Sequence, residues 1–445
     1  TMCPSYMVTR EEKHSTRGRA HLLWEMLQGE VITDGWRSDE VKDALDLCLS
    51  CKGCTGECPV EVDIPTYKAE FMSHYYEGRL RPLKAYAFGF IDRWAQLASI
   101  APELVNLVTH APGTSHLAKA VVGMPQQRRI PSFGPQSFQS WMKRHRSKPK
   151  GKVKGDVLLW PDTFNNYFHP ETAQAAVEVL EGAGYNVIVP KSHVCCGRPL
   201  YDFGFLTEAK RYLRRNFEVI EDYVDAGVPM VVLEPSCASV FRDEMVNLMP
   251  NDAVAKRLNN QTFLLSEFLE KHADGYQPPP LKRKMLVHAH CHHKALLKMG
   301  DEKALIKKMG ADAEFPDTGC CGMAGPFGFE REKYEVSIAA GERVLLPAVR
   351  HASEQDIIVA DGFSCREQIA QQTDRHALHL AEVLQLAHSS ELDRHSGQRP
   401  EQTVTNRVNK AKRRARLKLI AVAAIALAAC TAMASLRSRP SSAAR

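Results

Sequence analysis

Four cysteines stand close together near the start of the chain, in the segment CLSCKGCTGECP. Cys48, Cys51, Cys54 and Cys58 follow the spacing C-x2-C-x2-C-x3-C-P, which is the ligand spacing of a bacterial 4Fe–4S cluster. The alternatives are a structural zinc site or a group of buried thiols. Structural zinc favours two separated C-x2-C pairs over one dense run. The spacing therefore predicts a chain that carries single electrons.

A second cysteine–proline pair, Cys3-Pro4, repeats the ending of this motif, and the chain does not begin with Met. We expect the chain to begin inside an earlier motif and to be the C-terminal part of a longer protein. In proteins with two such clusters, the last cysteine of each motif ligates the other cluster. Cys3 would then join Cys48, Cys51 and Cys54, and Cys58 would serve a second cluster whose other ligands lie upstream. The alternative is that Cys3 is an incidental thiol.

Two basic residues, Arg17 and Arg19, lie in a helix predicted over residues 11–27. They would either balance the negative charge of a nearby cluster or form a solvated face. The sequence leaves both roles open.

A Cys-Cys-Gly motif occurs twice further along the chain, each time followed at a similar distance by a single cysteine. Glycine lets the backbone turn tightly, so that two thiols can face one metal. The second motif is joined by a cysteine in the histidine-rich run HAHCHHKAL, whereas Asp162 stands at the matching place before the first. We expect a four-thiolate metal set in the second half and a weaker one in the first. The alternative for each is a set of structural thiols. The second set is Cys291, Cys320, Cys321 and Cys365, and the first is Cys195, Cys196 and Cys237.

The elements around these motifs alternate between short apolar strands and amphipathic helices, which is typical of a parallel α/β sheet. The carboxyl ends of parallel strands meet at one edge, where ligands usually bind. We therefore predict an α-helical ferredoxin-like domain followed by two repeated α/β cysteine-rich lobes. The expected strands are 157–160, 185–189, 229–233, 285–288 and 356–360, with helices over 171–183, 206–226 and 294–309. The expected domains are a ferredoxin-like domain 1–75, a helical connector 76–150, lobes 151–275 and 276–390, and a basic linker with a tail 391–445.

The composition is that of an ordinary globular protein, with 445 residues, 44% of them hydrophobic and 25% charged. The net charge is +6, and a basic run over 410–416 supplies most of the excess. The remainder is near neutral, so we expect no nucleic-acid partner. Thirteen cysteines in clustered positions indicate metal binding in a reducing, cytoplasmic compartment.

An apolar run over 419–434 has basic residues on both sides. Counted over 417–436 it approaches the length of about 20 residues that a spanning helix needs. We expect either a C-terminal membrane anchor or a loosely ordered or interfacial helix.

Several segments together resemble the C-terminal half of fused FAD-binding and Fe–S-binding oxidoreductases. The chain is also similar to the glycolate oxidase iron–sulfur subunit and, in its paired lobes, to the cysteine-rich domain of heterodisulfide reductase. The segments are MCPSYMVTREEKHSTRGRA, CLSCKGCTGECPVEVDIPTYKAEF, CCGRPLYDFG, HCHHKAL, GCCGMAGPFG and DGFSCREQIA.

The resemblance implies an FAD domain or subunit that oxidises a D-2-hydroxy acid such as D-lactate, glycolate or D-2-hydroxyglutarate. Electrons would pass from FAD through the iron–sulfur centres to a quinone or another carrier. The chain departs from the family in two respects. It shows no flavin-binding pattern, so no residue is assigned to hydride abstraction. In addition, PSCASV and FSCREQ each hold one cysteine where heterodisulfide reductase has C-x2-C. The alternatives are a disulfide-reductase-like enzyme acting at the Cys-Cys-Gly lobes and a non-redox, zinc-stabilised binding protein.

Overall fold

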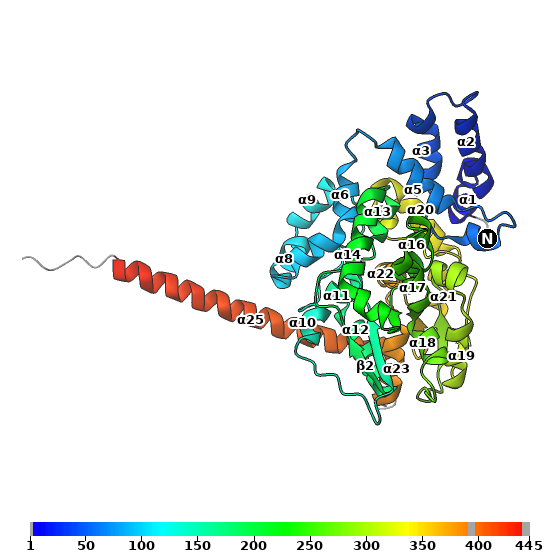
Figure 1. Cartoon of the computed structure of the whole chain (residues 1–445). Helices are drawn as coiled ribbons and strands as arrows, with labels where there is room; N and C mark the ends of the chain where they lie inside the picture. The colour runs from blue at the N-terminus through cyan, green and yellow to red at the C-terminus, as the bar shows by residue number, and fades with distance from the viewer. Residues whose placement is uncertain (1–2, 390–396, 438–445) are drawn as a thin grey trace, which may run out of the picture.

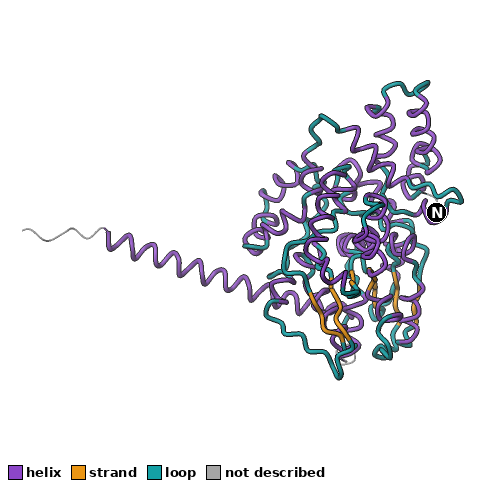
Figure 2. Tube along the Cα trace, viewed as in Figure 1, coloured by secondary structure: helices purple, strands orange, loops and turns teal. Residues whose placement is uncertain are grey.

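The computed structural model describes residues 3–389 and 397–437, excluding the side chains of 418, 419 and 422–437. Helices surround two small parallel sheets that lie side by side in the lower half of the molecule (Figures 1 and 2). The predicted parallel sheets are therefore confirmed.

The N-terminal part is a group of helices that carries the first cysteine motif between α3 and α5. Polar side chains fix the helix starts: the Ser15 hydroxyl accepts a hydrogen bond from the Gly18 N–H, and Asp63 accepts one from the Thr66 N–H. The predicted helix over 11–27 begins later, at Thr16, because a short 3-10 turn comes first. The helices are α1 (Pro4–Thr9), α2 (Thr16–Gln28), α3 (Asp39–Asp46), α4 (Gly53–Glu57) and α5 (Ile64–Tyr75).

A second group of helices leads from there to the sheets. Its inner side packs on the rest of the protein through residues such as Ala95, which is fully buried. These helices are α6 (Leu83–Gly89), α7 (Ile91–Ala98), α8 (Pro102–His110), α9 (Thr114–Val121) and α10 (Phe138–Met142).

The first sheet has the strand order β2-β1-β3-β4, and every neighbouring pair is parallel. The strands are β1 (Gly155–Leu159), β2 (Tyr185–Ile188), β3 (Met230–Val232) and β4 (Thr262–Leu264), the last of which was not predicted. The helices are α11 (Thr163–Tyr167), α12 (Pro170–Gly182), α13 (Arg198–Asp202), α14 (Leu206–Asp225), α15 (Pro235–Ser239), the π-helical turn η3 (Val240–Glu244), α16 (Met245–Leu248), α17 (Ala253–Gln261) and α18 (Leu265–Lys271).

The second sheet has the order β6-β5-β7 and is also parallel. The predicted helix over 294–309 is divided, because Lys298 adopts a positive φ of 69° between a π-helical turn and α19. The strands are β5 (Lys284–Val287), β6 (Asp312–Glu314) and β7 (Ile357–Val359), of which β6 was not predicted. The helices are η4 (His293–Leu297), α19 (Gly300–Lys308), α20 (Tyr334–Glu342), α21 (Leu345–His351), α22 (Phe363–Gln372) and α23 (Leu380–Ser389).

A single buried apolar cluster joins the two sheets. It contains Val157 and Val231 of the first sheet together with Met285 and Ile357 of the second, all at most 1% exposed. The carboxyl ends of β1, β3, β5 and β7 lead directly into the segments with Asp162, Cys237, Cys291 and Cys365. The shared core therefore places the site segments of both sheets on one side.

The chain continues from this core into the long helix α25 (Pro400–Arg437), which projects away from the body (Figure 1). Most side chains of the membrane helix expected over 417–436 lie outside the described residues. Within the part of the chain that the structure describes, no helix has the length and apolar character needed to cross a membrane.

The glycines of the two Cys-Cys-Gly turns provide a matched test of the turn geometry. Gly197 and Gly322 both have positive φ, 82° and 86°, but a Cβ on Gly322 would lie 2.0 Å from the Ser337 carbonyl oxygen. A Cβ on Gly197 would meet nothing closer than 3.6 Å. Gly197→Ala should cost about 1–2 kcal/mol for its left-handed backbone, and Gly322→Ala should cost a further ~1–3 kcal/mol for the clash. Urea unfolding curves of the two variants measure the difference; equal midpoints would contradict the turn geometry.

Candidate functional site

Four of the five cysteines predicted for the cluster lie around one small cavity. Cys3 precedes α1, and Cys48, Cys51 and Cys54 come from the loop between α3 and α4 and from the first turn of α4. Cys58, at the end of α4, is not among the residues that line this cavity. The N–H groups of Val62 and Val60 lower its pKa instead. The arrangement is the one expected if Cys58 belongs to another cluster.

Burial dominates the acid–base behaviour of the cavity thiols. It raises the pKa of Cys3 and Cys51 above the ordinary value, and that of Cys54 to about 11. Thiols of this kind stay protonated at neutral pH unless a metal binds, and metal binding releases the protons. The donor set is therefore chemically suited to an iron–sulfur cluster.

Arg19 is the basic residue that reaches this cavity. It is 1% exposed, and its guanidinium donates hydrogen bonds to the Cys3 sulfur (3.4 Å), the Ser5 hydroxyl (2.9 Å) and the Ala44 carbonyl (2.8 Å). Arg17 lies at the surface, where it pairs with Glu12. Of the two roles left open by the sequence, Arg19 has the position for charge balance and Arg17 belongs to the solvated face.

The cysteine loop is held by a buried lysine within the motif itself. Lys52 has a positive φ of 60°, and its side chain is fully buried between two carboxylates, with Nζ 2.7 Å from Asp63 and 2.6 Å from Asp243. Asp243 belongs to η3, which follows the first cysteine set. The loop is thereby tied to the first sheet.

Arg198 and His292 bind the same loop from two further directions. Arg198 directly follows Cys195-Cys196-Gly197 and forms an ion pair with Glu244, whose side chain is fully buried. Its Nη2 donates a hydrogen bond to the Ser50 carbonyl at 3.2 Å, and His292 Nε2 lies 2.8 Å from the same oxygen. The segment between Cys48 and Cys51 therefore contacts residues next to both Cys-Cys-Gly sets.

The first thiol set is assembled at the end of β3. The sulfurs of Cys196 and Cys237 lie 3.0 Å apart, and the Thr163 hydroxyl donates to the Cys195 sulfur at 3.6 Å. Asp162 is fully buried, and burial with the nearby Glu234 carboxylate raises its pKa to about 6. Asp162 also accepts hydrogen bonds from the N–H groups that begin α11. The structure thus brings three thiols together with a carboxylate in the fourth place.

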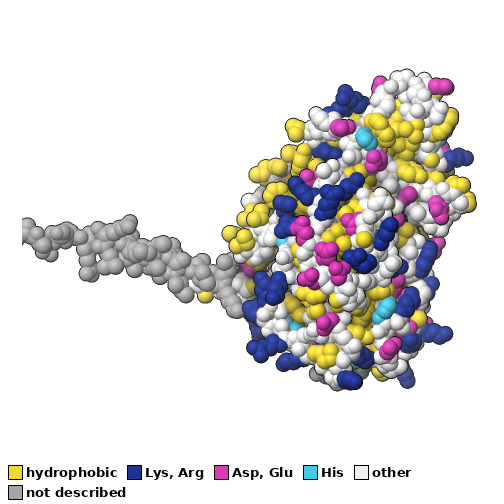
Figure 3. All heavy atoms as spheres, viewed as in Figure 1, with side chains coloured by type: hydrophobic (Ala, Val, Ile, Leu, Met, Phe, Trp, Pro, Cys, Tyr) yellow, Lys and Arg dark blue, Asp and Glu magenta, His cyan; other side chains and the backbone are white. Residues whose placement is uncertain are grey.

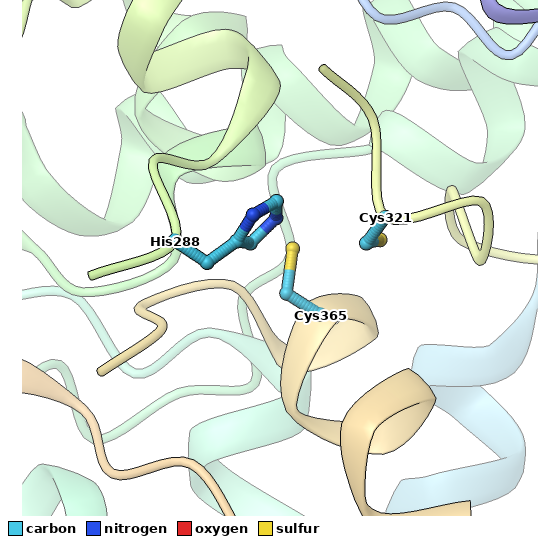
Figure 4. Close-up of side chains that lie close together, drawn as sticks. All are labelled: His288, Cys321 and Cys365. Carbon is cyan, nitrogen blue, oxygen red and sulfur yellow. The ribbon is translucent and has the colours of Figure 1, made fainter. Parts of the chain in front are cut away.

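The second thiol set is joined by a histidine. His288, Cys321 and Cys365 place their ligand atoms within 4.8 Å of one another (Figure 4). Cys320 hydrogen-bonds both Cys291 and Cys321. The pKa of Cys321 lies well below its ordinary value because Cys321 accepts hydrogen bonds from Cys320 and then Cys365. All four predicted cysteines therefore lie in one connected group.

His288 is oriented in the way that metal-ligating histidines usually are. Its Nδ1 lies 2.7 Å from the Thr318 hydroxyl, and its buried Nε2 has no hydrogen-bond partner among the described residues. A partner on one ring nitrogen fixes the tautomer and leaves the other nitrogen free for a metal. The residues present therefore fit a metal or cluster with mixed sulfur and nitrogen ligation.

Two other groups of residues that could ligate a metal ion lie near this set. His290, Cys291 and His292 form one, and His293, Glu302 and Asp361 form the other, which is buried. Burial and the neighbouring Asp361 raise the pKa of Glu302 well above its ordinary value. These groups extend the ligand-rich region around the end of β5.

A central cavity of about 210 Å³ lies between the two thiol sets. Ser50 of the cluster loop, Cys196 and Cys237 of the first set, and Cys320 and Cys321 of the second line it. Arg198, Asp202 and Glu234 also line it, and the aromatic part of its wall is formed by Phe88, Phe133, Phe164, Phe168, Phe329 and Phe363. The cluster loop and both thiol sets thus meet at one apolar space.

Sequence reasoning missed Lys52, Arg198 and Glu244. Lys52 directly follows Cys51, and Arg198 directly follows a Cys-Cys-Gly motif. This closeness to the cysteines in the sequence could have identified both residues as part of the site. Glu244 lies apart from the cysteine motifs in the sequence, and only folding brings it to Arg198.

Removing Arg198 should be severe, because it would leave the fully buried Glu244 carboxylate with only Lys52 nearby, at 3.7 Å. We expect Arg198→Met to lower the free energy of unfolding by about 3–5 kcal/mol. Adding Glu244→Gln should restore part of that loss. The control is Arg350→Met, whose ion pair with Glu342 is solvent-exposed, and it should cost less than about 1 kcal/mol. Urea unfolding distinguishes these cases; an equal loss in both single variants would contradict the anchoring role.

Comparison with known proteins identifies two kinds of domain. Residues 1–62 match the 4Fe-4S dicluster domain, and residues 162–242 and 285–370 match the cysteine-rich domain. The first of these matches supports an iron–sulfur cluster in the N-terminal part.

Curated relatives cover most of the chain at low identity. D-2-hydroxyglutarate dehydrogenase of Pseudomonas putida is 28% identical over 426 residues, which are 86% of this chain and 41% of that protein. One subunit of the anaerobic glycerol-3-phosphate dehydrogenase of Escherichia coli is 28% identical over 314 residues, 68% of this chain and 77% of its own length. The glycolate oxidase iron-sulfur subunit of Escherichia coli is 21% identical over 392 residues, 86% of this chain and 91% of its own length. The chain spans about two fifths of the D-2-hydroxyglutarate dehydrogenases that it matches.

These matches confirm the resemblance that the sequence motifs indicated. The chain thus matches a 4Fe-4S dicluster domain and a cysteine-rich domain, and over most of its length it is similar to D-2-hydroxyglutarate dehydrogenases and to the glycolate oxidase iron-sulfur subunit.

Proposed function

We propose that this chain is the iron–sulfur electron-transfer portion of a flavin-dependent D-2-hydroxy-acid dehydrogenase, an oxidoreductase. It would pass electrons from FAD, bound on another domain or subunit, to a quinone or another carrier. The observation that carries the proposal is the single cavity formed by Cys3 with Cys48, Cys51 and Cys54, next to a second thiol set. D-lactate, glycolate and D-2-hydroxyglutarate are the substrate class, which the names of two relatives support.

In this proposal Cys3, Cys48, Cys51 and Cys54 hold one 4Fe–4S cluster, and Cys58 serves a second one completed by residues upstream. A bound cluster of this kind accepts and releases one electron at a time. The protein's own contribution is to bury the thiols, to orient them through the strained loop at Ser50 and Lys52, and to place the Arg19 charge beside them. Cys51 and Cys291 line one further cavity, so transfer between the two ligand sets would cross a short distance.

We infer that Cys291, Cys320, Cys321 and Cys365, with His288, hold a second metal or cluster and form the exit side of the path. Cys195, Cys196 and Cys237 are the weaker candidates, because Asp162 replaces a fourth thiol. The family's C-x2-C segments are missing here, so the disulfide-reductase-like alternative has less support. If the protein is instead a non-redox, zinc-stabilised binding protein, the purified protein should be colourless.

The domain division inferred from the sequence stays part of the proposal: a ferredoxin-like domain 1–75, a helical connector 76–150, two repeated lobes 151–275 and 276–390, and a tail 391–445. The cysteine-rich matches at 162–242 and 285–370 support the two lobes. The apolar cluster shared by both sheets implies that the lobes unfold together.

The cluster assignment is tested by comparing Cys51→Ser with Cys58→Ser on anaerobically purified protein. Cys51→Ser should lose about one cubane of iron and its reduced EPR signal. Measured on the 445-residue chain, Cys58→Ser should keep both, because Cys58 lies outside the cavity and the proposal places the other ligands of its cluster upstream of this chain. In the complex with the flavin-bearing part, Cys51→Ser should leave flavin reduction by substrate intact while acceptor reduction fails. Equal iron loss in both variants, or zinc in place of iron, would refute the assignment.

The second set is tested by Cys320→Ser and His288→Ala, with Cys195→Ser as the first-set comparison. If the second set binds a cofactor, both second-set changes should lower iron content and slow acceptor reduction at least about ten-fold, which corresponds to roughly 1.4 kcal/mol. Cys195→Ser should have the smaller effect. Unchanged iron and unchanged acceptor reduction in Cys320→Ser would make the second set purely structural.

A further inference from the structure

Helices α7, α8 and α9 present an unusually apolar outer face. Eight large apolar side chains within this short segment are at least half exposed, and Ile100 reaches 81%. The remaining seven are Trp94, Leu97, Leu104, Leu107, Val108, Leu117 and Val121. Hydrophobic side chains gather in this part of the surface, over α8 and α9 (Figure 3). Contiguous exposed patches of this kind mark interaction sites in soluble proteins.

The inner side of the same helices packs against the core. The exposed apolar side chains on the outer side therefore do not mean that the helices are detached from the rest of the protein. Ile91, Ala95 and Ala98 of α7, and Val105 of α8, pack in the cluster that contains Phe133 and Phe363. On α7 and α8, the apolar residues therefore occupy both sides of each helix. One side belongs to the core, and the other keeps at least half of each of its large apolar side chains exposed.

Charge favours an anionic lipid surface as that partner. The segment 91–121 has only two acidic residues, Asp92, which is 1% exposed, and the half-buried Glu103. The helix α25 contacts α8, and it carries the exposed basic residues Lys410, Arg413, Arg414 and Arg416. An apolar face beside a basic run is the pattern of interfacial membrane binding.

The apolar face is less suited to the flavin-bearing part. The candidate cluster lies in the N-terminal helices, which Figure 1 draws at the upper right, away from α8 and α9. Trp24, Leu27 and Val31 form another exposed apolar group on the N-terminal helices themselves. That group is nearer to where electrons from a flavin would have to enter.

We propose that the outer face of α7, α8 and α9 docks on the surface of an anionic lipid bilayer without spanning it. Ile91 of α7, together with Phe88 just before this segment and Met124 and Ile130 just after it, lines the central cavity between the thiol sets. Docking would bring this aromatic cavity next to the membrane, where a lipid-dissolved quinone can enter. The docking does not depend on the function proposed above, whereas the entry of a quinone rests on that proposed function.

The docking is tested by flotation of the full chain with vesicles of phosphatidylcholine and phosphatidylglycerol, and with phosphatidylcholine alone. The wild type should float with the anionic vesicles, and less at high salt. Leu104→Glu/Leu107→Glu should bind about ten-fold more weakly or worse, whereas the matched control Leu27→Glu/Val31→Glu should bind like the wild type. Should the double variant fail to fold, Ile100→Glu, on the most exposed of these residues, replaces it.

Fluorescence locates the contact. Brominated lipids should quench the tryptophan emission of the vesicle-bound wild type, and Trp94→Phe should remove most of that quenching. Three outcomes would overturn the docking. The first is that the wild type does not float with the vesicles. The second is that the face variant floats as well as the wild type, which would assign membrane binding to the tail alone. The third is that the only effect of the face variant is to convert a dimer to a monomer in light scattering, which would make a second copy of the chain the partner.

Quinone entry has a separate readout. After reduction by dithionite and removal of the excess, each reduced 4Fe–4S cluster gives up one electron. Two protein molecules therefore supply the two electrons, and water the two protons, that convert one quinone to its quinol. A long-chain quinone in the vesicles should oxidise the wild type faster than the face variant, while a short-chain, water-soluble quinone should oxidise both equally. If neither quinone oxidises the wild type, the quinone part of the proposed function fails and the docking result stands. Equal rates of both proteins with the long-chain quinone would overturn entry through this face.

Discussion

The buried ion pair of Arg198 with Glu244 is the interaction on which the arrangement of the site depends. Two charges removed from water stabilise a fold only when further hydrogen bonds satisfy them. Here the guanidinium also binds the Ser50 carbonyl, and Lys52 lies between Asp63 and Asp243 on the other side. These charges tie one loop to residues beside the first thiol set, and His292, whose Nε2 lies 2.8 Å from the same Ser50 oxygen, ties it to the second set. The geometry of that loop therefore follows from a network that spans the N-terminal helices and both sheets.

Hydrogen bonds between neighbouring cysteines, together with burial, explain how thiols that are costly to ionise can lie together in the interior. Burial raises the pKa of Cys51, and hydrogen bonds to neighbouring cysteines, followed by burial, raise the pKa of Cys195 and Cys365. The pKa of Cys321 is lowered instead, because Cys321 accepts hydrogen bonds from Cys320 and Cys365. A bound metal would favour the thiolate form of its cysteine ligands. The second set has His288 beside its cysteines and the first set has Asp162 instead, so the two sets differ in chemistry although they use the same turn.

Apolar residues lie on both sides of the helical segment before the sheets. Inside, Phe133, Phe168 and Phe363 close the central cavity and keep that wall free of charge. Outside, the same segment carries leucine side chains and Ile100 that are more than half exposed. A thin layer that is apolar on both sides can separate an internal cavity from an apolar environment. This is the physical basis for linking the cavity to a lipid surface.

The sequence by itself determined the ligand types and the local turns. Cysteine spacing, the two Cys-Cys-Gly turns and the strand–helix alternation are short-range patterns, and local sterics and hydrogen bonding are enough to interpret them. It also indicated that Cys3 joins Cys48, Cys51 and Cys54, by analogy with paired motifs. The strands β3 and β7 are as short as β4 and β6 but consist of buried apolar residues. The strand β6 was missed because its sequence Asp-Ala-Glu is polar and largely exposed, and β4 was missed because it follows α17 directly, without turn residues between them.

Only the tertiary structure decided which side chains meet. Glu244 pairs with Arg198, and His292 reaches Ser50, across long stretches of sequence. The burial of Arg19 and the exposure of Arg17 likewise depend on which helix face meets α3, since Arg19 bonds the Ala44 carbonyl there. Such contacts arise from packing between distant elements, and spacing along the chain contains no information on them.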